Sequence, residues 1–109
     1  MVKVSFFKKD GYIVKFEMKG HAEFSEENDI VCAALSAVAY STINGIENVL
    51  GLKCGYETND DGYLFFVLPD DLDDESLKKA SILLDTMYLF ISDLHKQHPE
   101  NVAILEPEV

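Results

Sequence analysis

Two side chains in the first third of the chain have the chemistry of a base and a nucleophile. His21 follows Gly20, and Cys32 comes eleven residues later at the start of a long apolar stretch. A cysteine thiolate is a strong nucleophile, and a neighbouring histidine can take the thiol proton and pass it to a leaving group. This pairing predicts a cysteine hydrolase.

Asp29 and Ser36 share a helical stripe with Cys32, because the three residues stand at i, i+3 and i+7. Asn28 or Asp29 suits the N-cap of this helix, which would place Cys32 near the unpaired N–H groups of the first turn, where an oxyanion could be held. A helix terminus contributes only about 0.3–1 kcal/mol, whereas a paired imidazolium lowers a cysteine pKa by several units. We therefore expect His21 to be the main activator, and Asp29 to cap the helix, orient His21 or hold a substrate N–H.

Each of these residues also has an ordinary structural interpretation. Cysteine is among the most buried residue types, so Cys32 could be a packed core residue. Ser36 could bond to the preceding helical turn, and Asp29 could be a cap alone.

The elements that position these residues follow from the spacing of apolar side chains. Alternation predicts strands over residues 2–6 and 12–18, joined by an Asp-Gly turn, and a second hairpin over 53–58 and 63–68. Apolar residues three and four apart predict a helix over 29–50, stopped by Gly51, and a second helix that follows the acidic run 70–75 and ends before Pro99. Residues 102–105 predict a last strand. The order ββαββαβ indicates an α+β fold in which two amphipathic helices cover a mixed sheet, as one domain over residues 1–109.

Composition excludes several classes of function. The net charge is −11, from 20 acidic and 9 basic residues, which argues against direct binding to nucleic acid and favours basic partners. The longest uncharged stretch, 30–46, is shorter than the ~20 residues that span a bilayer, so we expect no membrane association. The chain begins as an alternating strand rather than as a signal peptide. Two cysteines and no leader predict reduced thiols in the cytoplasm.

Two other kinds of site deserve comparison with the hydrolase. A redox sensor would use Cys32 and Cys54, and requires the sulfurs to approach each other or one of them to be exposed with a low pKa. A zinc site is not expected, since His95 and His98 lie where a helix C-terminus favours histidine and no thiolate is spaced to join them. We expect no metal and no cofactor.

The combined motif resembles the signature of the ribosomal-processing cysteine proteases, the Prp family. The similarity lies in Gly20-His21-Ala22, a short acidic loop and the run from Asp29 to Ser36, and it extends over essentially the whole chain. The resemblance implies a cytoplasmic homodimeric endopeptidase that removes the N-terminal extension of the large-subunit ribosomal protein L27 and cuts after an aromatic residue. Cys32 would be the nucleophile and His21 the general base, with supporting roles for Gly20, Asp29 and Ser36. It also implies an apolar pocket near Cys32.

The chain departs from the family pattern in the loop after His21, which the resemblance implies is a cover over the cleft. Residues 23–28 are one residue shorter than the pattern and lack its usual glycine. Phe24 could act there as an apolar latch. The alternative from another class is a non-catalytic dimeric ribosome-assembly factor in which Cys32 is a structural core residue.

Overall fold

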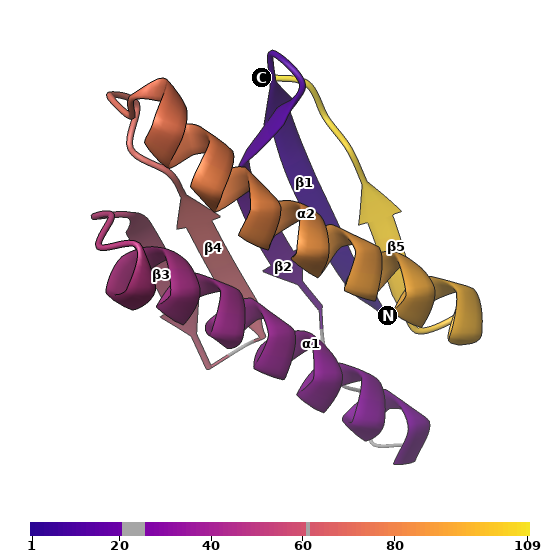
Figure 1. Ribbon diagram of the computed structural model, residues 1–109. Helices are drawn as coiled ribbons and strands as arrows, with labels where there is room; N and C mark the ends of the chain where they lie inside the picture. Colours follow the sequence, from indigo (N-terminus) through magenta and orange to yellow (C-terminus); the bar gives the residue numbers. More distant parts are fainter. Residues whose placement is uncertain (21–25, 61) are drawn as a thin grey trace.

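Two ββα units and a closing strand make up the chain. The computed structural model describes residues 1–20, 26–60 and 62–109 (Figure 1). The elements are β1 (Val2–Lys9), β2 (Tyr12–Lys19), α1 (Glu26–Asn44), η1 (Gly45–Val49), β3 (Gly55–Asn59), β4 (Tyr63–Val67), α2 (Asp74–Gln97) and β5 (Val102–Leu105). The predicted order ββαββαβ is confirmed, with η1 a one-turn π-helix that continues α1.

All five strands form one sheet in the order β3-β4-β2-β1-β5. β1 pairs in parallel with β5, and the other neighbours are antiparallel, which confirms a mixed sheet. The first hairpin turns at Asp10 and Gly11, whose φ angles are 53° and 84°. Positive φ at both central residues matches the twist of a two-residue hairpin, and it explains the Asp-Gly sequence.

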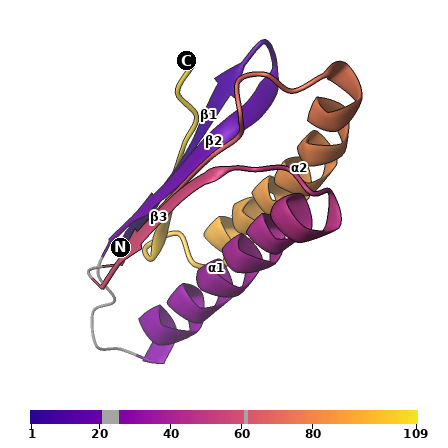
Figure 2. The same ribbon diagram turned by 90° about the vertical axis from the view of Figure 1, so that its left-hand side faces the viewer.

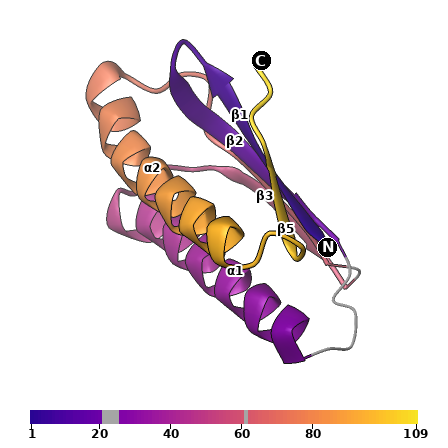
Figure 3. The same ribbon diagram turned by 90° about the vertical axis from the view of Figure 1, so that its right-hand side faces the viewer.

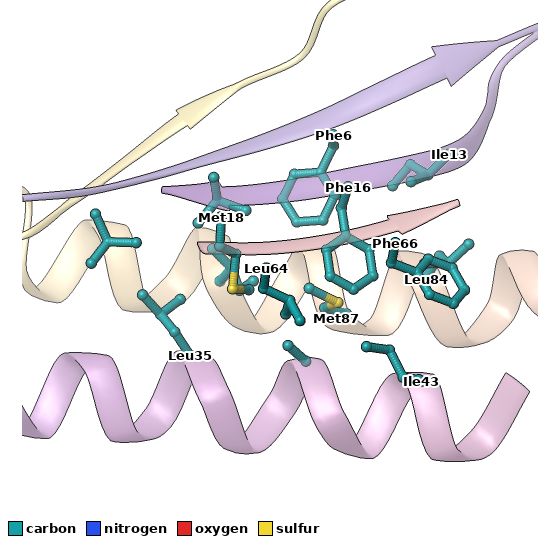
Figure 4. Close-up of a cluster of buried hydrophobic side chains, with 14 of the residues drawn as sticks. Phe6, Ile13, Phe16, Met18, Leu35, Ile43, Leu64, Phe66, Leu84 and Met87 are labelled. Carbon is teal, nitrogen blue, oxygen red and sulfur yellow. The ribbon is translucent and has the colours of Figure 1, made fainter. Parts of the chain in front are cut away.

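Both helices lie on the same face of the sheet, as the two edge-on views show (Figures 2 and 3). The strand residues that point toward them are apolar, and Phe6, Phe16 and Phe66 are fully buried. The Phe16 and Phe66 rings stack with centroids 5.0 Å apart, and Leu84 and Met87 of α2 close over this cluster (Figure 4). The predicted α+β architecture follows directly from this one-sided core.

The opposite face of the sheet carries polar and aromatic side chains in contact with one another. Lys15 Nζ lies 4.2 Å from the Phe7 ring centroid and 4.9 Å from that of Phe65. Tyr63 donates a hydrogen bond from its hydroxyl to Glu17, at 3.0 Å. No helix of the described part of the chain lies against this face (Figure 3).

α1 begins earlier than the predicted residue 29, at Glu26. Residues 26 and 27 were expected to belong to the loop, yet both are glutamates, which the positive end of a helix dipole favours. The predicted end was right: Leu50 closes the last turn by donating from its N–H to Gly45 O at 2.9 Å, and Gly51 follows with φ 73°. The segment Asp29–Val49 is long and apolar enough to cross a membrane by length and composition. It contributes buried residues to the same core as the sheet, among them Val31, Leu35 and Ile46.

The start and end of α2 agree with the prediction. Asp73 is its N-cap and accepts a hydrogen bond from the Ser76 N–H at 2.7 Å. At the other end, the His95 ring lies 2.6 Å from the Val102 carbonyl oxygen and so ties the helix to β5.

Candidate active site

A cavity of about 400 Å³ lies between the N-terminal half of α1 and the end of the sheet nearest to it. Toward this end, α1 and the strands diverge (Figure 2). The wall is formed by residues of α1, of β1 and β2, and of the β3–β4 hairpin: Val2, Met18, Gly20, Cys32, Leu35, Ser36, Tyr40, Thr58, Asn59, Asp60, Gly62, Tyr63 and Leu64. The cavity thus combines apolar side chains with hydroxyl, amide and carboxylate groups around one thiol.

Cys32 is half-buried in this wall, and its environment favours the protonated thiol. Burial raises the pKa of the Cys32 thiol, and the nearby Asp29 carboxylate raises it further, while the amino group of Met1 acts weakly in the opposite direction. An ordinary cysteine is mostly the protonated thiol at neutral pH, and burial and the Asp29 carboxylate oppose thiolate formation further. Attack on a carbonyl therefore requires a base that removes the thiol proton.

The earlier start of α1 changes where Cys32 stands on the helix. Cys32 is the seventh residue of α1, in its second turn, rather than a residue of the first turn. The four N–H groups without a helical acceptor belong to residues 26–29. Cys32 thus lies just beyond the first turn, and the hypothesis that N–H groups at the helix start hold an oxyanion stays a prediction.

Three of the five predicted site residues meet in the cavity wall, namely Gly20, Cys32 and Ser36. Asp29 is exposed one turn before Cys32 and is not part of the wall, although its charge reaches the thiol. His21, Phe24 and residues 23–25 of the predicted cover lie outside the described residues, whereas residues 26–28, which were expected in that loop, belong to α1. Asp29 is the fourth residue of α1 rather than its cap.

Gly20 holds the end of β2 against two other backbone segments. Its φ is 150°, which L side chains rarely adopt, and a Cβ placed on it would lie 2.7 Å from Val2 Cα and overlap the Met1 carbonyl oxygen. On the hairpin side, a Cβ on Gly62 would overlap the Gly20 carbonyl oxygen. Two glycines therefore allow β1, β2 and the β3–β4 turn to converge directly before position 21.

The second hairpin contributes cavity residues that the sequence did not indicate. Thr58, Asp60 and Tyr63 line the cavity opposite Cys32. From α1, Tyr40 also lines the cavity and meets Tyr56 of β3 edge to face, with ring centroids 6.4 Å apart. Tyr40 lies two turns after Cys32, so helical spacing could have found it, whereas the hairpin residues depend on long-range strand pairing.

Cys54 lies apart from the cavity, directly before β3, whose other end supplies Thr58 and Asn59 to the wall. Both cysteines are free. Burial and the nearby Glu47 raise the pKa of Cys54 to about 11, which is the reverse of what a redox-sensing thiol needs. Across the described ranges, no three histidine, cysteine or carboxylate side chains are grouped so that they could hold a metal ion.

A family model, curated relatives and solved structures all show similarity of this chain to one group of proteins. The family model "Cysteine protease Prp" matches residues 1–103. The ribosomal processing cysteine protease Prp of Bacillus subtilis is 32% identical over 97 residues, which are 87% of each chain. Among solved structures, the Prp protease of S. aureus with a covalently linked product peptide has a TM-score of 0.83 at 27% identity, over 97% of this chain and 99% of that one. SMU.848 from Streptococcus mutans has the same fold, with a TM-score of 0.87 at 24% identity, over 100% of this chain and 99% of that one.

Proposed function

Because the chain belongs to the Prp family of cysteine proteases, we propose that it cuts the N-terminal extension from the precursor of the large-subunit ribosomal protein L27 during ribosome assembly. The relatives are named for ribosomal processing. One observation carries the proposal: Cys32 lines a cavity of about 400 Å³ together with Gly20, which follows β2 and directly precedes His21 in the sequence. The resemblance of the Gly20-His21 and Asp29-to-Ser36 motifs supplies the choice of L27.

Cys32 is the nucleophile and His21 the base of the proposed mechanism. His21 takes the proton from the Cys32 sulfur as the sulfur bonds to the scissile carbonyl carbon, and it then gives that proton to the departing amine. His21 then removes a proton from water as the water oxygen bonds to the thioester carbonyl carbon. The C–S bond breaks, His21 returns the proton to the Cys32 sulfur, and the new carboxylate is released. The raised pKa of the thiol makes this base necessary, because burial and Asp29 both oppose a resting thiolate.

The supporting residues have distinct tasks in this proposal. Gly20 sets the path of the chain into His21, Ser36 offers a hydroxyl one turn beyond the nucleophile, and Asp29 faces the approaching substrate from the exposed side of α1. The apolar wall that includes Leu35 and Leu64 suits an aromatic substrate side chain. This fits cleavage after an aromatic residue.

The proposal includes the setting in which the enzyme works. The net charge of −11 favours encounter with the basic extension of a ribosomal protein. We place the enzyme in the cytoplasm, where its two thiols stay reduced, and we propose a homodimer. Exposed apolar side chains on α2, namely Ile82, Leu89 and Phe90, support the homodimer. Multi-angle light scattering of the purified chain gives the test, with a mass twice that of one chain expected.

Mass spectrometry of the L27 precursor incubated with the enzyme tests the activity. The wild type should release the extension at a single position, and Cys32→Ala and His21→Gln should release none. Cys54→Ala is the matched control, because its thiol lies outside the cavity, and it should cleave at the wild-type rate. Cleavage by Cys32→Ala would refute the proposal.

A further inference from the structure

β3 is an edge strand whose outer side is open. It is the terminal strand of the sheet, and within the described part of the chain its pairing is with β4 alone. All five of its residues are exposed. Figure 2 looks onto this edge, and no other element crosses it. The N–H and C=O groups on the outer side of an edge strand are available to a further strand.

This edge has few of the features that usually prevent such pairing. Proteins protect edge strands with lysine, proline, bulges or very short strands. β3 contains one charged residue, Glu57, but neither lysine nor proline, and its register with β4 runs without a shift from Gly55 opposite Val67 to Asn59 opposite Tyr63. The edge from Gly55 to Thr58 therefore remains open to pairing.

The open edge leads into the cavity that holds Cys32. Thr58 and Asn59 belong both to β3 and to the cavity wall. We propose that the substrate backbone binds as an added strand along the outer edge of β3, and that this pairing carries the scissile bond into the Cys32 cavity. This inference rests on the proposed peptidase function and adds the way in which its substrate is recognised.

The two faces of β3 indicate which side chains of an added substrate strand would contact the protein. Tyr56 and Thr58 lie opposite the buried residues Phe66 and Leu64 in the β3–β4 register, so they point toward the helices. Because side chains alternate along a strand, every second residue of the added strand points the same way. Those residues meet the Tyr40–Tyr56 pair, whose rings are 43% and 45% exposed without a substrate.

Pairing of this kind defines the substrate class. Main-chain hydrogen bonds supply affinity without regard to sequence, and pockets for alternate side chains supply specificity. The substrate is an extended segment of about five residues or more, read at every second side chain. A helical or folded segment is not a substrate, since its N–H and C=O groups are already paired.

A backbone-methylation scan tests this inference with the protein fold unchanged. Peptides that span the cleavage position of the L27 extension carry one N-methyl group each, and their binding to Cys32→Ala is measured by calorimetry. Removal of one hydrogen bond should weaken binding by about 2- to 12-fold at every second position, with little change at the positions between. Losses without this alternation would overturn the inference.

Amide hydrogen exchange provides a second measurement with an internal control. When the unmodified peptide saturates Cys32→Ala, amides in Gly55–Asn59 should exchange more slowly at alternate residues. Those of β5, the opposite edge of the same sheet, should not change. Unchanged exchange in β3 with a bound peptide would overturn the inference and leave the peptidase function intact. A peptide that is neither bound nor cut would refute the peptidase function, and the inference with it.

Discussion

Gly20→Ala tests whether the backbone convergence before His21 determines both stability and catalysis. The new Cβ would lie 2.7 Å from Val2 Cα, while ordinary contacts of a Cβ begin at 3.4 Å. The end of β2 must therefore move by most of an ångström. Alanine also has to hold the φ of 150° that Gly20 adopts, at a cost of about 1–3 kcal/mol, and the overlap adds about 1–3 kcal/mol.

Gly11→Ala is the matched control at the other end of the same hairpin. Gly11 also has a positive φ, 84°, but a Cβ there would have no heavy atom within 4 Å. Only the conformational cost of about 1–2 kcal/mol applies. Both variants should stay folded, because domains of this size have unfolding free energies of about 5–15 kcal/mol.

Urea unfolding followed by circular dichroism measures the two free energies, and cleavage of an extension peptide gives kcat/KM. We expect Gly20→Ala to lose about 2–6 kcal/mol of unfolding free energy. Since a 1 Å displacement at an active site can lower the rate about 100-fold, it should also lose about 10- to 100-fold in kcat/KM. Gly11→Ala should keep the wild-type kcat/KM. If the two variants lose equal stability and both cleave at the wild-type rate, the argument from backbone convergence is wrong.

Three perturbations address other parts of the molecule. Asp29→Asn should speed the alkylation of Cys32 by iodoacetamide at pH 8 by about 2- to 5-fold, because the Asp29 carboxylate helps to raise the pKa of the thiol; an unchanged rate would contradict that coupling. Phe66→Ala should lower the free energy of unfolding in urea by about 3–5 kcal/mol, since the ring is fully buried. Phe65→Ala, on the open face of the sheet, should lower this free energy far less. Equal losses would contradict the assignment of the two side chains to opposite faces. Asp73→Ala should lower the melting temperature at neutral pH, because the first turn of α2 holds the pKa of the Asp73 carboxyl below its usual range. This stabilisation is complete above about pH 5 and is lost as the pH falls through the lowered pKa. A difference in melting temperature that persisted at pH 2 would refute the capping role.

Local signals predicted most of the fold. Alternating apolar residues and the turn at Asp10-Gly11 are sufficient for the first hairpin, and Gly51 marks where the first helix ends. The π-helical turn at Gly45 had no such signal. A Cβ at Gly45 would lie 3.0 Å from Leu83 of α2, so close packing between two helices bears on this turn, and that contact is not readable from neighbouring residues.

The site was predictable only along α1 and at the end of β2. Helical spacing aligned Cys32 with Ser36, and both line the cavity. The opposite wall depends on the pairing of β2 with β4, in which Met18 lies opposite Leu64. Alternation along a strand indicates which side chains share a face, but it does not indicate which strand becomes the neighbour. For that reason Thr58 and Asp60 were not among the predicted site residues.

The parallel pairing of β1 with β5 has a consequence for synthesis of the enzyme. Val2 lies opposite Val102, donates its N–H to Asn101 O at 2.8 Å, and also lines the cavity. Because about 100 residues separate the two strands, β1 waits roughly 5–20 s for β5 at ordinary translation rates. Until then one wall of the cavity lacks its outer support.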